Sequence, residues 1–265
     1  MTGSLSAHGV TVRVGKKALL TNISLVLEPG QLHAVIGLNG AGKSTLLRCL
    51  AGDLEAATGS VELNGRALHL WHRKERARRV AILSQELRIE FPLTCLEVAL
   101  LGRGPHVRFR ESRRDREIAF ETLAAMGVEH LAEREYPSLS GGEKQRVQLA
   151  RVLAQLWQNE SEPLSEPCYL LLDEPTSSLD LIHQHRMMQI VCGIAARGIG
   201  ILVILHDLNL ASRYAKKVLV LKDGRVLANG PTRTVLQPEL VREAFGLQVQ
   251  LVPHPEASHD LVVPV

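Results

Sequence analysis

The fold of this chain is decided by the stretch Gly37-Leu38-Asn39-Gly40-Ala41-Gly42-Lys43-Ser44-Thr45. It follows Leu32–Ile36, a run that is apolar except for His33 and predicts a buried parallel strand. It precedes a helical stretch from Lys43 to about Leu50. In this context the glycines let backbone N–H groups turn inward around phosphate oxygens, and the helix N-terminus adds a favourable dipole. The stretch therefore predicts a phosphate-binding loop in an α/β fold, with Lys43 on the β- and γ-phosphates and the Ser44 hydroxyl on Mg²⁺.

A second motif follows another buried strand. The hydrophobic run Tyr169–Leu172 leads directly into Asp173 and Glu174, at the sheet edge where the phosphate-binding loop is also expected. Asp173 suits an outer partner of Mg²⁺, and Glu174 suits a general base for the water that attacks the γ-phosphate. Alone, this pattern is as compatible with an acidic turn as with a catalytic pair. Beside the phosphate-binding loop, it predicts nucleotide hydrolysis.

A third motif is Leu139-Ser140-Gly141-Gly142-Glu143-Lys144-Gln145, which opens a helix predicted over Gly141–Leu156. A serine hydroxyl beside a free helix N-terminus forms a second anion site. The alternative is a simple helix cap, for which Ser140 is well suited. Because the chain holds two such sites but one phosphate-binding loop, we predict a head-to-tail dimer. Each ATP would lie between the loop of one subunit and Ser140, Gly141 and Gly142 of the other.

Length and composition fit one large α/β domain. The chain has 265 residues, a net charge of +3 and 3% aromatic residues. The charge is too small to argue by itself for a polyanion partner, and the few aromatic residues argue against a stacking platform for nucleic acid. Its four cysteines form no CxxC pair and fit a reducing cytosol. Neither a signal peptide nor a membrane-spanning run is expected, so a membrane role requires a partner subunit.

Pattern changes along the chain predict its internal organisation. We expect residues 1–265 to form a single domain, with an inserted helical subdomain over about 86–138 and a C-terminal tail over about 236–265. The predicted helices are Thr94–Leu101, Ser112–Met126, Gly141–Leu156, Leu181–Ala196 and Pro238–Phe245. Strands are predicted at Val10–Val14, Ile23–Leu27, Val61–Leu63, Val80–Leu83, Ile201–Leu205, Val218–Leu221, Arg225–Ala228, Gln248–Val252 and Leu261–Val265, with a surface loop over Trp157–Pro167.

These motifs, together with Ser177–Asp180, resemble in order and spacing the ATP-binding domains of ABC transporters over residues about 5 to 235. The resemblance implies an N-terminal antiparallel β region, a RecA-like α/β core and an inserted helical subdomain. It identifies Gln85 with the family's Q-loop glutamine and His206 with its switch histidine. The expected catalytic residues are therefore Glu174, His206 and Gln85, and the expected Mg²⁺ ligands are Ser44, Asp173 and Gln85.

Further segments are similar to the ATPases of iron-chelate, cobalamin and haem importers. They are Glu90–Thr94, Glu97–His106, Asp180–His185 and Leu205–Leu210; the tail, with Phe245-Gly246-Leu247 and His254-Pro255, is most like bacterial haem-import ATPases. This implies an ATPase that couples hydrolysis to haem uptake, with ferric siderophore or cobalamin as the alternative substrates. It implies a homodimer on two copies of an integral permease, at the cytoplasmic face of the bacterial inner membrane. A periplasmic binding protein would act indirectly, and no nucleic-acid partner is expected.

Two other classes of ATPase fit the sequence less well. DNA-repair ATPases of the same superfamily carry a long coiled coil between the phosphate-binding loop and the third motif, and no sustained heptads occur there. Soluble ATPases that resemble translation factors normally carry two cassettes, whereas this chain has one. His183 and His185 lie two apart on a predicted helix and do not share a face, so they are not expected to bind haem together.

Some features depart from the family pattern or stay open. Family members usually carry an aromatic residue in the first strand that stacks on adenine, and here Val12 and Val14 occupy the expected places. Leu38 stands where proline is common. The basic segment Trp71–Arg79 could face anionic lipid or nucleic acid, and a solvated helix face is favoured over both. The second basic segment, Arg103–Arg116, fits a permease contact, proximity to the inner leaflet, or a plain surface.

Overall fold

The computed structural model describes residues 3–84, 89, 91–157, 166–177 and 179–265. An antiparallel sheet near the N-terminus has the strand order β2-β1-β4-β5. Its strands are β1 (Leu5–Val14), β2 (Lys17–Leu27), β4 (Thr58–Leu63) and β5 (Arg66–Ala67). Strand β1 begins earlier than its sequence pattern predicts. Gly9 has φ +59° and the pairing register shifts between Ala7 and Val10, so a bulge breaks the alternation of side chains.

The central sheet has the strand order β10-β9-β3-β8-β7-β6. Strands β3, β6, β7, β8 and β9 pair in parallel, and β10 pairs antiparallel to β9. Their bounds are β3 Leu32–Ile36, β6 Val80–Leu83, β7 Tyr169–Leu172, β8 Gly200–Ile204, β9 Lys217–Lys222 and β10 Arg225–Pro231. Every residue of β3, β7 and β8 is buried, as expected for strands covered on both faces.

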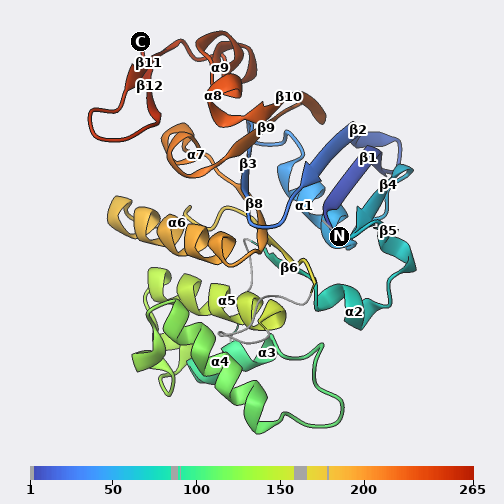
Figure 1. Ribbon diagram of the computed structural model, residues 1–265, viewed down its shortest axis with the longest axis vertical. Helices are drawn as coiled ribbons and strands as arrows, with labels where there is room; N and C mark the ends of the chain where they lie inside the picture. The colour runs from blue at the N-terminus through green and yellow to red at the C-terminus, as the bar shows by residue number, and fades with distance from the viewer. Residues whose placement is uncertain (1–2, 85–88, 90, 158–165, 178) are drawn as a thin grey trace.

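Helices cover both faces of this sheet (Figure 1). Helix α1 (Lys43–Ala51) packs with β1 and β2 on one face, and α5 (Gly141–Leu156) and α6 (Leu181–Ala196) pack on the other. Helix α5 also contacts α3 (Cys95–Leu101) and α4 (Arg113–Ala125), which lie below the sheet in Figure 1. The helical layer therefore attaches to the sheet through α5. Short 3₁₀ turns at Glu129–Leu131 and Tyr136–Ser138 lie between α4 and α5, and another at Leu68–Leu70 follows β5.

The helices of the helical layer begin at well-formed caps. The side chains of Thr94, Ser112 and Ser140 each accept a hydrogen bond from the backbone N–H three residues on. The carboxylate of that residue in turn accepts a bond from the backbone N–H of the cap residue. Such capping boxes satisfy two of the N–H groups that a helix start leaves unpaired. The short helix α2 (Arg73–Ala77) precedes β6, and none of its residues is fully buried. Its exposure agrees with the solvated helix expected for this basic segment.

The C-terminal part packs beside the sheet. It contains α7 (Leu208–Tyr214), α8 (Thr232–Val235), α9 (Pro238–Phe245), β11 (Val249–Pro253) and β12 (Asp260–Pro264). The β11–β12 hairpin is held to α7 because the Asn209 side chain bonds both the N–H and the C=O of Val262, and Ser212 Oγ donates to Asp260 O. Within the described ranges, no helix is long and apolar enough to cross a membrane.

A buried histidine in β3 gives the fold a measurable pH dependence. His33 is 2% exposed, and neither ring nitrogen makes a hydrogen bond of normal geometry to the described residues. Burial lowers the pKa of His33 from 6.5 to about 4, because the charged form is poorly solvated there. The unfolded chain therefore binds this proton at a higher pH than the folded chain. Stability is lost as the pH falls from about 6.5 towards 4.

We expect His33→Leu to remove this part of the acid sensitivity. Relative to the variant, the wild-type free energy of unfolding should fall by about 3 kcal/mol between pH 7 and pH 4. Urea unfolding of both proteins at several pH values measures the difference, and the carboxylates common to both cancel. Parallel curves for the two proteins would mean that His33 is protonated as readily in the folded chain as in the unfolded chain, because its ring reaches solvent when folded.

Candidate functional site

The predicted phosphate-binding loop lies between the end of β3 and the start of α1. Gly37 has φ +152°, and a Cβ there would lie 2.3 Å from the backbone oxygen of Leu221. Gly42 has φ +99°, and its Cβ would lie 2.6 Å from Leu20 Cδ2. Only glycine fits at these two positions. The motif glycines are therefore required by close packing against β2 and β9 as well as by the turn itself.

The loop borders a cavity of about 780 Å³, a size that suits a nucleotide-sized ligand. Asn39, Gly40, Gly42, Lys43, Ser44 and Thr45 line it from the motif, and Glu174 and His206 line it from the ends of β7 and β8. The remaining motif residues do not line it. Ala41 is 4% exposed and packs in the core, and Leu38 is 54% exposed. The structure thus brings together the loop, Glu174 and His206, which are far apart in sequence.

Lys43 is held inside its own loop. Its Nζ donates to the carbonyl oxygens of Gly37 at 2.9 Å and Leu38 at 3.1 Å, and the residue is 6% exposed. Burial lowers the pKa of Lys43, and the nearby carboxylates of Glu174 and Asp173 oppose that shift. The lysine is therefore positioned at the wall of the cavity, with its ammonium group within reach of an anion placed in the loop.

Asp173 presents a buried carboxylate beside the same loop. It is 9% exposed, and its Oδ1 has no hydrogen-bond partner among the described residues. Burial raises the pKa of Asp173, while a hydrogen bond with the Ser44 side chain lowers it. A buried carboxylate oxygen without a donor is costly unless a cation or proton compensates it. The residues therefore fit a hard divalent cation bound through one carboxylate, one hydroxyl and ligand phosphates.

The described protein side chains at this position are too few to hold a metal ion without a phosphate ligand. Over the described residues, no group of three or more His, Cys, Asp or Glu side chains could hold a metal ion. Mg²⁺ commonly uses one or two carboxylates with substrate phosphates, which is the arrangement that Asp173 and Ser44 offer. Gln85, the third expected ligand and an expected catalytic residue, lies outside the described residues.

Glu174 and His206 form a close pair across the ends of β7 and β8. Glu174 Oε1 lies 2.5 Å from His206 Nε2, and the Glu174 side chain is 15% exposed against 45% for His206. Glu174 also has φ +51°, a left-handed conformation that is uncommon for a residue with a side chain. The strained backbone and the histidine together fix the carboxylate at the cavity, where it could accept a proton from a water molecule.

The third motif lies apart from this cavity within one chain. Ser140 is the N-cap of α5: its Oγ donates to Glu143 Oε2 at 2.7 Å and accepts from Glu143 N at 3.4 Å. The helix-cap interpretation is confirmed. Ser140 and Gly142 do not line the phosphate-loop cavity, and Gly141 lines a neighbouring cavity of about 220 Å³ that also includes Asp173 and Glu174.

Two segments of the cavity wall were missed by the sequence motifs. The cavity is also lined by residues 17–19 of β2 and by Asp223 and Gly224 of the β9–β10 turn. Thr21 N donates to Gly224 O at 2.8 Å, and a Cβ on Gly224 would lie 2.5 Å from Leu19 O. The Asp-Gly turn was predictable from the sequence, but its packing against β2 was not, because no local signal connects segments 200 residues apart.

The two valines at the expected aromatic positions differ in exposure. Val12 is 1% exposed and belongs to the core between the sheets, so it cannot face a ligand. Val14 is 61% exposed and pairs across the β1–β2 turn with Lys17, which lines the cavity. Of the two positions, only Val14 lies at the surface beside the site.

Comparison with known proteins shows the family to which this chain belongs. Residues 20–177 match the model of the family described as ABC transporter. The chain is 50% identical to the Hemin import ATP-binding protein HmuV of Gloeobacter violaceus over 98% of this chain and 94% of that one. Identity to the protein of the same name in Myxococcus xanthus is also 50%, over 98% and 97%.

A solved structure agrees with these relatives. A chain from a metal-chelate type ABC transporter in an inward-facing conformation superposes with a TM-score of 0.84 at 27% identity, covering 100% of this chain and 98% of that one. The fold of this chain is therefore that of the matched ABC transporter chain. This chain belongs to the ABC transporter family.

Proposed function

We propose that this chain is the ATP-hydrolysing subunit of a bacterial haem importer. The observation that carries the proposal is 50% identity, along nearly the whole chain, to relatives named Hemin import ATP-binding protein. The grouping of Lys43, Glu174 and His206 around one cavity supplies the chemistry such a subunit needs. The subunit would act at the cytoplasmic face of the inner membrane, as a peripheral protein on two copies of a permease. A periplasmic binding protein would deliver the substrate.

In the proposed reaction, ATP binds with its phosphates in the Gly37–Thr45 loop. Lys43 exchanges its bonds to the loop carbonyls for the β- and γ-phosphates, and backbone N–H groups hold the remaining oxygens. Mg²⁺, held by Ser44, Asp173 and Gln85, would neutralise charge on the phosphates. Glu174 takes a proton from the attacking water, and His206 keeps that carboxylate oriented towards the γ-phosphate. The uncompensated Oδ1 of Asp173 supports the cation.

The proposal includes a homodimer in which Ser140, Gly141 and Gly142 contact the partner's ATP. One observation supports it: in a single chain these residues lie away from the phosphate-loop cavity, although they form a helix N-terminus that suits anions. The Ser140 hydroxyl, which now donates to Glu143 Oε2, would donate to phosphate instead. Closure of such a dimer on ATP and its reopening after hydrolysis would drive the permease between conformations.

The shared site can be tested with Ser140→Arg. We expect this variant to bind ATP, because its own loop is intact, but to hydrolyse it at least about 100-fold more slowly, as when transition-state contacts to phosphate are lost. Nucleotide binding by fluorescence and phosphate release with the permease measure the two effects. Ser140→Ala serves as the control for loss of the helix cap alone. If Ser140→Arg turns over ATP at the rate of Ser140→Ala, the motif is only a cap.

The exposed Val14 predicts weak discrimination between bases. Without an aromatic residue there, stacking worth about 1–3 kcal/mol per base is missing, and GTP should compete with ATP within about tenfold. Val14→Tyr should tighten ATP binding, whereas Val26→Tyr, at another exposed position of the same sheet, should not. Competition binding with labelled ATP measures both. A wild-type preference for ATP far above tenfold would mean that other residues already recognise adenine.

The substrate is tested by reconstitution. The chain would be assembled with its genomic permease and binding protein in liposomes, and ATPase stimulation and uptake compared for haem, a ferric siderophore and cobalamin. Haem is expected to stimulate both. Stimulation by one of the other two compounds, with none by haem, would refute the substrate and leave the importer function standing. The Glu174→Gln variant in the same liposomes separates coupled uptake from leakage.

A further inference from the structure

Two basic segments that are far apart in the sequence form one surface. The loop between α3 and α4 lies against α2, where Lys74 Nζ donates to Val107 O at 3.3 Å. Arg78 donates to Pro105 O through Nε and Nη2, at 3.2 and 3.0 Å. In Figure 1 this loop reaches away from the helices to lie below α2. We call residues 72–79 and 103–111 together the basic edge.

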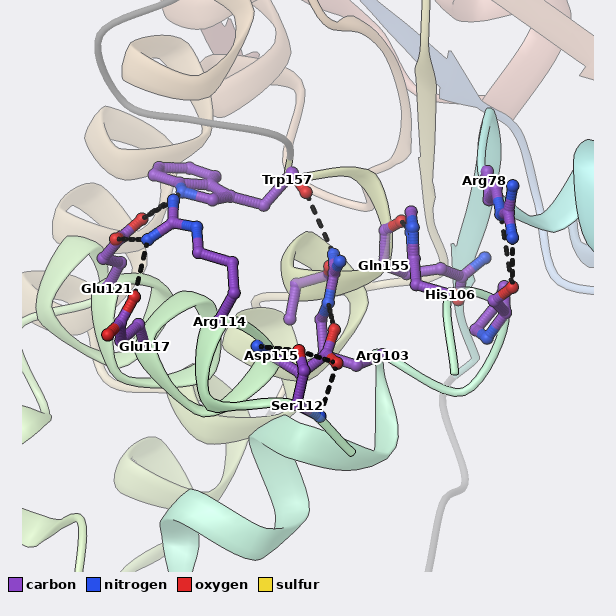
Figure 2. A network of polar contacts seen from close by, with 12 residues as sticks. Arg78, Arg103, His106, Ser112, Arg114, Asp115, Glu117, Glu121, Gln155 and Trp157 are labelled. Carbon is purple, nitrogen blue, oxygen red and sulfur yellow. Dashed lines mark hydrogen bonds and ion pairs between the residues drawn. The ribbon is translucent and has the colours of Figure 1, made fainter. Parts of the chain in front are cut away.

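The base of the α3–α4 loop is clamped by buried polar contacts (Figure 2). The Arg103 side chain is 7% exposed; its Nε donates to Asp115 Oδ1 at 3.0 Å, and its Nη1 donates to the C=O groups of Ala154 and Trp157. His106 Nε2 donates to Gln155 O at 2.9 Å. Asp115 also closes the capping box of α4. A buried ion pair whose partners make further hydrogen bonds keeps a single conformation. The base of the loop is therefore rigid, and the tip projects from it.

The tip itself carries an exposed aromatic residue between two cations. Phe109 is 99% exposed and lies between Arg108 and Arg110 in the sequence. Within the part of the chain that the structure describes, no carboxylate pairs with Arg108, Arg110, Arg73 or Lys74. The basic edge contains two acids, Glu75 and Glu111. A single exposed phenylalanine is ordinary, but here it stands on a fixed base among unpaired cations.

We propose that the basic edge binds the surface of an anionic phospholipid bilayer. Phe109 would enter the boundary between headgroups and acyl chains, and Arg108, Arg110 and Lys74 would contact lipid phosphates. Aromatic and basic side chains on one surface are the combination that binds anionic membrane interfaces. The inference goes beyond the proposed function, from which it takes only that the subunit works beside a membrane.

The aromatic content of this surface favours lipid over nucleic acid. Single-stranded nucleic acid is held by successive aromatic residues on which bases stack. The other aromatic residue nearby, Trp71, is half-buried, and the guanidinium groups of Arg66 and Arg79 lie 5.3 and 4.7 Å from its ring centroid. Phe109 is thus a lone apolar tip rather than part of a stacking row. One exposed aromatic side chain surrounded by basic residues suits the surface of an anionic bilayer.

The test is sedimentation of the full chain with phospholipid vesicles. We expect binding to vesicles that contain phosphatidylglycerol, weak binding to pure phosphatidylcholine vesicles, and loss of binding as salt is raised. The double variant Arg108→Gln/Arg110→Gln should weaken partitioning about 30-fold, since each basic residue near an anionic surface contributes a comparable increment. Phe109→Ser should weaken it about tenfold. The matched control, Lys216→Gln/Arg242→Gln, removes the same charge from exposed positions elsewhere and should bind as wild type does.

Three outcomes would overturn the inference. The first is equal vesicle binding by the tip variants and the control. The second is displacement of the vesicles by an RNA oligonucleotide whose binding requires the same residues. The third is weaker assembly of the tip variants with the permease in lipid-free detergent, which would make the basic edge a protein contact. Because vesicle binding needs neither ATP nor substrate, its failure leaves the liposome uptake result unaffected, and failed haem uptake leaves the vesicle result unaffected.

Discussion

Glu174→Gln is expected to bind ATP normally and to hydrolyse it at least about 100-fold more slowly, the usual contribution of a general base. The glutamine side chain has nearly the same shape and can still accept the hydrogen bond from His206 Nε2, 2.5 Å from Glu174 Oε1 in the wild type. It cannot accept a proton from water at neutral pH. Nucleotide binding and single-turnover hydrolysis, measured on the same preparation, separate these two effects.

The same variant reports on the proposed dimer. If hydrolysis opens the shared sites, Glu174→Gln should accumulate as a dimer with ATP bound, which gel filtration with saturating ATP and Mg²⁺ can detect. His206→Gln is the useful companion, because it leaves the carboxylate in place but removes the imidazole that orients it. It should lower the rate less than Glu174→Gln does. A monomer that retains bound ATP would contradict the shared-site arrangement, and normal turnover would remove Glu174 from the chemistry.

Local chemical signals made much of the fold predictable. The helices α6 and α9 have the predicted bounds, Leu181–Ala196 and Pro238–Phe245. The first begins at the N-cap Asp180, and the second ends at Gly246 in a left-handed conformation. Such caps are encoded within a few residues of the boundary. Helix α7 was not predicted, although Asp207 caps it by accepting from the N–H groups of Asn209 and Leu210.

The candidate site was predictable only where its residues follow motifs. Lys43, Asp173 and Glu174 follow or adjoin buried strands, and parallel strands place their carboxyl ends at one edge. The part of the wall made by residues 17–19 and by Asp223 and Gly224 depends on how the β9–β10 turn packs against β2. That contact joins segments 200 residues apart and has no local signature. The union of the two basic segments through Lys74 and Val107 was unpredictable for the same reason.

For Ser140 the sequence allowed two roles, and the structure of one chain cannot test the second of them. The sequence allowed either a helix cap or an anion site, and the structure shows the cap, with both bonds to Glu143 in place. In the cap, the Ser140 hydroxyl oxygen accepts one backbone N–H, that of Glu143. The N–H groups that precede it at the helix start are not used by this bond, so capping and anion binding are compatible. Whether an ATP reaches that helix depends on a second subunit. Local sequence carries no information on this point, and the Ser140→Arg comparison addresses it directly.

Lys43→Ala is expected to abolish most ATP binding at micromolar nucleotide. The ammonium group is buried in the loop and held by the carbonyls of Gly37 and Leu38 at 2.9 and 3.1 Å, so it is already placed where phosphates would enter. A charge-assisted contact to phosphate inside a partly buried site contributes about 1.5–3 kcal/mol, and its loss weakens binding roughly 10- to 150-fold. Isothermal titration with ATP measures this loss.

The decisive comparison for the phosphate-binding loop is between Lys43→Ala, Lys43→Met and Lys43→Arg. Removing Lys43 also leaves the Gly37 and Leu38 carbonyls without their donor, so a variant could lose ATP by losing the loop conformation. Lys43→Met preserves most of the buried stem, and a normal melting temperature for it would show that the fold is intact. Lys43→Arg keeps the charge but changes the geometry, so partial binding is expected. ATP affinity in folded Lys43→Met close to that of wild type would show that the lysine charge is not what holds the phosphates.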